Sequence, residues 1–73
     1  MNKRMQYLVE GITKDIVYFL MDEEGYGLSD AIGVFYNSET FAKLTDEETG
    51  LYIESSSHVY EILKGELKYG KIQ

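Results

Sequence analysis

A chain of 73 residues has room for one hydrophobic core, so we expect a single domain over residues 1–73. It contains no cysteine and one histidine, which excludes disulfides, thiol catalysis and metal sites built from cysteine or from several histidines. The formal net charge of −6 opposes binding to nucleic acid and to anionic membranes.

The first segment has the pattern of one long helix from about Lys3 to Glu24. Its apolar residues recur at steps of three and four along the chain: Met5, Leu8, Val9, Ile12, Ile16, Phe19 and Leu20. At about 1.5 Å per residue, such a helix spans a whole domain of this size. Residues 16–21 are apolar on every face, which favours a homodimer that covers the excess. This run is too short to cross a membrane and has no signal-peptide character, so we expect a cytoplasmic protein.

Gly25 and Gly27 predict the turn that follows the long helix. Ser29 is a suitable N-cap for a second helix from about Ser29 to Tyr36. A break at residues 37–38 then precedes a short third helix that ends near Leu44.

Residues 45–48 predict a structured loop, and residues 51–53 an extended connector that buries Leu51 and Ile53. Three serines at positions 55–57 predict the cap of a last helix, which runs to about Tyr69 and ends at Gly70. The predicted fold class is all-α: a small single-domain bundle in which one long N-terminal helix packs against three shorter helices.

No set of residues has the spacing of a catalytic, cofactor-binding or metal-binding site. His58 follows the three serines, but serines at the start of a helix act as caps more often than as nucleophiles. The acidic triplets at residues 22–24 and 46–48 lack the alternating spacing of a calcium loop. We therefore expect a protein that is not an enzyme and uses no cofactor.

Seven tyrosines and a concentration of acids point to a protein-binding surface. Tyrosine suits surfaces that alternate between water and a partner, although seven rings could equally cover a small core. Nine acidic residues and one lysine lie between positions 22 and 54, a balance that favours a basic partner. The predicted partner-binding residues are Tyr18, Asp22, Glu23, Tyr26, Tyr36, Asp46, Glu47, Tyr52 and Tyr60.

The alternative is a small DNA-binding transcriptional regulator. The second and third helices with their break resemble a helix-turn-helix, and Lys64, Lys68 and Lys71 lie at helical spacing near the C-terminal end. However, the would-be recognition helix carries Glu39 and only one cation, Lys43, so it offers few donors for phosphates or base edges.

The second half of the chain contains a longer pattern of packing and turn residues. It reads Ser38-x-Thr40-Phe41-x-x-Leu44-x-Asp46-x-x-Thr49-Gly50-Leu51-Tyr52-x-x-Ser55, followed by Val59-Tyr60-Glu61-x-Leu63. This pattern resembles a group of small bacterial helical proteins of uncharacterised function. Some of that group are similar to accessory or antitoxin-like partners encoded beside toxins of the ADP-ribosyltransferase type. The resemblance implies an acidic, non-enzymatic protein that binds a basic, toxin-like enzyme.

Overall fold

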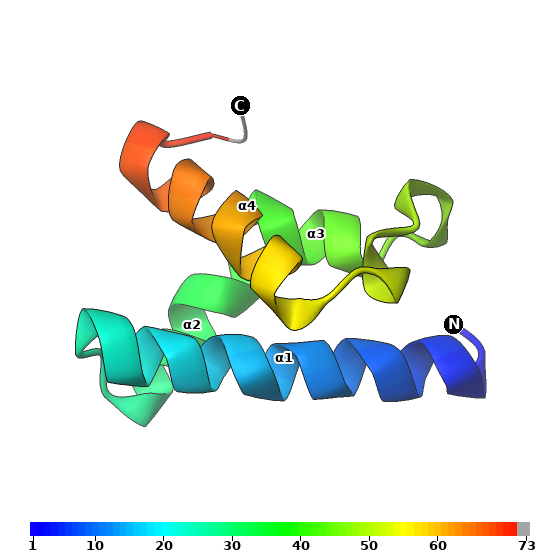
Figure 1. Cartoon of the computed structure of the whole chain (residues 1–73), viewed down its shortest axis with the longest axis horizontal. Coiled ribbons are helices and arrows are strands. Elements are labelled where there is room, and N and C mark those ends of the chain that lie inside the picture. The colour runs from blue at the N-terminus through cyan, green and yellow to red at the C-terminus, as the bar shows by residue number, and fades with distance from the viewer. Residues whose placement is uncertain (72–73) are drawn as a thin grey trace.

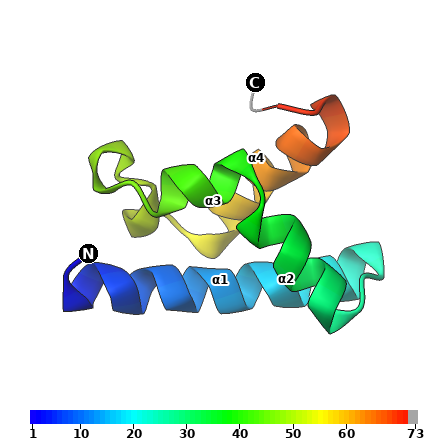
Figure 2. The same ribbon diagram turned by 180° about the vertical axis from the view of Figure 1, so that it is seen from behind.

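A computed structural model describes residues 1–71, over which all the regular secondary structure is helical and there is no strand. The helices are α1 (Lys3–Glu24), α2 (Leu28–Tyr36), α3 (Glu39–Leu44) and α4 (Ser56–Tyr69), with single 3-10 turns η1 (Glu47–Thr49) and η2 (Leu51–Ile53) between α3 and α4. The long α1 runs the length of the molecule, whose longest extent is 32 Å, and the shorter helices lie against it (Figures 1 and 2). The predicted all-α fold class is confirmed.

Local signals in the sequence explain most helix ends. The side chain of Asn2 accepts a hydrogen bond from the Met5 amide and begins α1, and Gly25, with a φ of 75°, ends it. Ser38 caps α3 in the same way, and Ser55 caps α4 as the serine triplet predicted. The second helix forms within one residue of its predicted start, but the predicted cap at Ser29 is wrong, because α2 begins at Leu28 and its cap is Gly27, which has no side chain.

The core is a continuous cluster that draws on every helix. Five of its buried residues repeat along one face of α1, and α2 and α4 contribute most of the others. The whole cluster consists of Met5, Val9, Ile12, Ile16, Leu20, Ala31, Phe35, Leu44, Leu51, Val59, Tyr60 and Leu63. The segment at 16–21 divides between core and surface. Ile16 and Leu20 are fully buried, while Tyr18 is 63% exposed and Met21 is 39% exposed.

Residues 51–53 form the 3-10 turn η2 and not the extended connector that the sequence predicts. Gly50, with a φ of 67°, allows the chain to reverse between η1 and η2. Leu51 is buried as predicted, but Ile53 is 61% exposed, so the prediction that Ile53 anchors the core is wrong.

Two side-chain contacts fasten α4 to the rest of the bundle. At its first turn, the Ser56 hydroxyl donates a hydrogen bond of 2.6 Å to the Asp15 carboxylate in the middle of α1. Near its other end, the Glu66 carboxylate accepts hydrogen bonds from the first turn of α3. Together these contacts set the direction in which α4 rises from α1 in Figure 1.

Candidate functional site

An apolar groove lies between α1, α2 and α3 and is the best candidate for a binding site. It has a volume of about 330 Å³ and is lined mainly by apolar side chains: Val9, Glu10, Thr13, Lys14, Val17, Ile32, Tyr36 and Phe41. The ring of Tyr36 stacks on that of Phe41, with centroids 4.7 Å apart and planes at 14°. Tyr36 remains 53% exposed and Ile32 38% exposed, so a partner could cover both.

Acidic residues lie close to this groove along the chain. Asp22, Glu23 and Glu24 are exposed at the C-terminal end of α1, beyond Val17, and α2 carries Asp30 but no basic residue. Glu10 and Lys14 line the groove from the middle of α1, where one charge offsets the other. The lining of the groove itself is therefore balanced, with one acid and one lysine.

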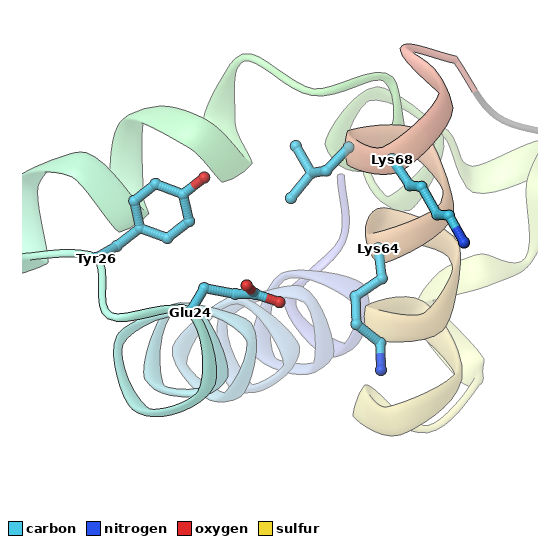
Figure 3. A pocket seen from close by; sticks show the side chains of 5 residues that line it. Glu24, Tyr26, Lys64 and Lys68 are labelled. Carbon is cyan, nitrogen blue, oxygen red and sulfur yellow. The ribbon is translucent and has the colours of Figure 1, made fainter.

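A second, more polar groove separates the C-terminal ends of α1 and α4. It has a volume of about 360 Å³ and is lined by Glu24, Tyr26, Lys64, Leu67 and Lys68. Figure 3 shows Glu24 and Tyr26 on one side of it and the two lysines on the other. The Lys64 amine lies 2.9 Å from the Glu61 carboxylate and 5.1 Å from the centre of the Tyr60 ring. The hydrogen bond with Glu61 is the main reason that the pKa of Lys64 is raised.

Tyr60 lies beneath this polar groove and belongs to the core. It is 4% exposed and packs against Phe19 with ring centroids 5.1 Å apart. Its hydroxyl is buried and has no hydrogen-bond partner among residues 1–71. Burial raises the pKa of Tyr60, and the negative charges of Glu23 and Glu24 raise it further. Tyr60, one of the predicted partner-binding residues, is therefore a buried core residue in this structure.

The other predicted partner-binding residues are spread over several surfaces. Tyr36 lines the apolar groove and Tyr26 the polar groove, whereas Tyr52 is half-buried against the core. Asp46 and Glu47 lie on the turn around η1, at the opposite end of α1 from the acids at 22–24 (Figure 1). The structure therefore does not bring the predicted acids together into one surface.

The groove residues Val17, Ile32 and Phe41 were not among the predicted partner-binding residues. Their apolar character and helical spacing indicate a core position, but in the fold Ile32 remains 38% exposed. The i, i+4 pairing of Ile32 with Tyr36 is the one sequence signal that could have marked this face.

Two of the serines considered for chemistry, Ser55 and Ser56, make structural hydrogen bonds. The Ser55 hydroxyl accepts a hydrogen bond of 3.1 Å from the His58 amide, so it caps α4. Within residues 1–71, no three or more acidic or histidine side chains are placed to hold a metal ion. None of the helices over that range is long and apolar enough to cross a bilayer.

No family model, no curated protein and no solved structure matches this chain.

Proposed function

We propose that this chain is a non-enzymatic protein-interaction module of the accessory or antitoxin-like type, which binds a basic protein partner. The observation that carries the proposal is the apolar groove between α1, α2 and α3, where Ile32 and Tyr36 are both exposed and Tyr36 stacks on Phe41. Apolar and aromatic side chains that are partly exposed in a concave site are typical of protein interfaces.

The charge of the molecule supports a basic partner. The net charge is −6, and acids outnumber the single lysine by nine to one between positions 22 and 54. Such a field attracts cationic surfaces and repels phosphates. The bound segment should therefore present an apolar side chain to the groove, with lysine or arginine next to it.

DNA binding is less well supported than protein binding. The helix α3 has only six residues, and its first backbone N–H groups already donate to the Glu66 carboxylate. A recognition helix contacts bases with its N-terminal residues, which here are covered by an acid. Of the three C-terminal lysines, Lys64 is paired with Glu61.

Affinity capture with two matched variants tests the proposal. The tagged wild-type chain, Ile32→Glu and Ile53→Glu are used as baits in a lysate of the source cell. Both isoleucines are exposed, but only Ile32 lines the groove, so the two variants add the same charge in different places. We expect wild type and Ile53→Glu to retain the same basic protein and Ile32→Glu to lose it by about tenfold, which is the effect of placing one charge in an apolar contact. Equal capture by all three baits would overturn the groove as the binding site.

A titration with duplex DNA distinguishes a DNA-binding regulator from a protein-binding module. It is done at about 0.1 M salt, where the electric field of surface charges still acts over roughly 10 Å. We expect no sub-micromolar binding. Tight binding that is lost when Lys64, Lys68 and Lys71 are changed to alanine would replace the protein-binding proposal with a regulator.

A further inference from the structure

The outer face of α1 carries a regular stripe that no other part of the described chain covers. Its members alternate at spacings of four and three, on the side opposite the five buried residues of α1: Tyr7, Gly11, Lys14, Tyr18 and Met21. Tyr7 is 77% exposed, the most of any large apolar side chain in residues 1–71, and Tyr18 is 63% exposed. This 3.5-residue spacing is the one by which two helices pack along their length.

Gly11 is unexplained within one copy of the chain. Glycine in a helix interior is less favourable than alanine, and a Cβ at Gly11 would meet no atom within 4 Å. A hollow of about 420 Å³ opens beside it, with Tyr7 and Lys14 among its lining residues. The missing side chain therefore leaves room on the surface for a group from another molecule.

The charges at the ends of α1 are opposite to those that the helix dipole favours. Lys3 and Arg4 lie in the first turn, and the acids at 22–24 lie in the last turn, whereas a helix is stabilised by acids at its start and cations at its end. The only ion pair within residues 1–71 is Lys64–Glu61, so these terminal charges have no ionic partner among those residues.

We propose that α1 forms an antiparallel homodimer through this stripe. In a pair related by a two-fold axis near Lys14, Tyr18 of one copy lies against Gly11 of the second copy, and Tyr7 lies against Met21. Arg4 and Asp22 project from the same edge of the stripe, so each Arg4 comes beside Asp22 of the other copy. The unfavourable charges at the two ends of α1 are then neutralised by the same contact, which occurs twice by symmetry.

A second copy fits this face better than an unrelated partner, because the stripe is complementary to itself. When one copy is turned about the two-fold axis, its large Tyr18 faces the small Gly11 of the other copy. The positive end of each α1 then lies beside the negative end of the other. A parallel pair would bring Arg4 against Arg4 and leave Gly11 facing Gly11. The two Lys14 side chains meet near the axis, and Glu10, one turn away on each copy, lies within reach of both.

Charge reversal tests the orientation of the pair. Sedimentation at about 100 µM, in the range of weak association, compares wild type, Arg4→Asp, Asp22→Arg and the double variant. We expect each single variant to weaken association by about tenfold, since two charge pairs are reversed per dimer, and the double variant to restore it. Arg4→Asp places an acid at the start of α1, where the dipole favours it, so the monomer should remain folded. A wild type that stays monomeric, or a double variant that is no better than the singles, would overturn the proposal.

Two glycine variants test the contact surface. Gly11→Leu and Gly65→Leu both fill open space in a helix interior, in α1 and α4 respectively. At a dilution where the chain is monomeric, each should raise the melting temperature by about 3–6 °C. Only Gly11→Leu should also weaken association, because only Gly11 lies under Tyr18 of the second copy. Unchanged association in Gly11→Leu would overturn this contact.

Discussion

Glu66 of α4 holds the first turn of α3 through Thr40. One carboxylate oxygen accepts from the Thr40 amide at 2.9 Å and from its hydroxyl at 2.7 Å, and the other accepts from the Glu39 amide at 2.8 Å. Thr40 is fully buried, so its hydroxyl depends on this contact. A residue 26 positions away along the chain thus adds a second cap to a helix that Ser38 already caps.

Glu66→Ala should destabilise the fold by about 1–3 kcal/mol, because it removes three hydrogen bonds to a carboxylate and leaves a buried hydroxyl without a partner. Urea denaturation measures the free energy of unfolding. The control is Glu61→Ala, which removes a surface ion pair from the same helix and should cost about 0.5 kcal/mol or less. Equal losses in the two variants would contradict the role of Glu66.

The same contact predicts a dependence of stability on pH. Burial alone would raise the pKa of Glu66, but the hydrogen bonds from the Thr40 hydroxyl and from the Glu39 and Thr40 amides together outweigh it, so the pKa is lowered from its usual 4.5. The folded state thus favours the carboxylate. Its contribution is complete above pH 4.5 and is lost as the pH falls through the lowered pKa. Unfolding of wild type and Glu66→Gln, followed from pH 7 to pH 3, should show the difference between them shrinking only in acid.

Leu51→Ala should destabilise the protein by about 2–4 kcal/mol, as large-to-small changes in a core do. Ile53→Ala is the matched control two residues away, and its exposed side chain should cost about 0.5 kcal/mol or less. Chemical denaturation of both variants distinguishes the 3-10 turn from an extended connector, for which the two losses would be alike.

Tyr60→Phe should leave the stability unchanged or raise it by about 1 kcal/mol. The substitution removes a buried hydroxyl that has no partner in residues 1–71 and keeps the ring that packs on Phe19. The melting temperature measures the effect. A clear loss of stability would indicate that the hydroxyl has a hydrogen-bond partner in solution.

The sequence was sufficient for α1, α3 and α4, because their apolar periodicity is long or their caps carry a side chain. It was insufficient for the start of α2, since the Gly27 cap leaves no side-chain signal. Ile53 was misplaced for a geometric reason. Residues two apart share a face in an extended chain but lie two-thirds of a turn apart in a 3-10 turn.

The candidate site was harder to predict than the fold. Ile32 and Phe41 have the residue types and spacing of core positions, yet Ile32 is 38% exposed and Phe41 is only half-buried. Tyr60 is the opposite case, since it was predicted to lie at a binding surface but is buried. It lies between Val59 and Leu63 on the inward face of α4. Its position beside these two residues could have indicated burial, but tyrosine is compatible with either environment. The hydrogen bonds of Glu66 join α4 to α3, which are far apart in sequence, so no local sequence pattern predicts them.

The hydrogen bond between Asp15 and Ser56 has a kinetic consequence. It joins positions 41 apart, so it closes a loop that contains α2, α3 and both short turns. Closing such a loop costs chain entropy before α4 can gain its contacts. In contrast, α1 and α2 are separated by three residues and can pack early. We therefore expect α4 to dock after the rate-limiting barrier of folding. Loss of this contact should then raise the unfolding rate and have little effect on the folding rate.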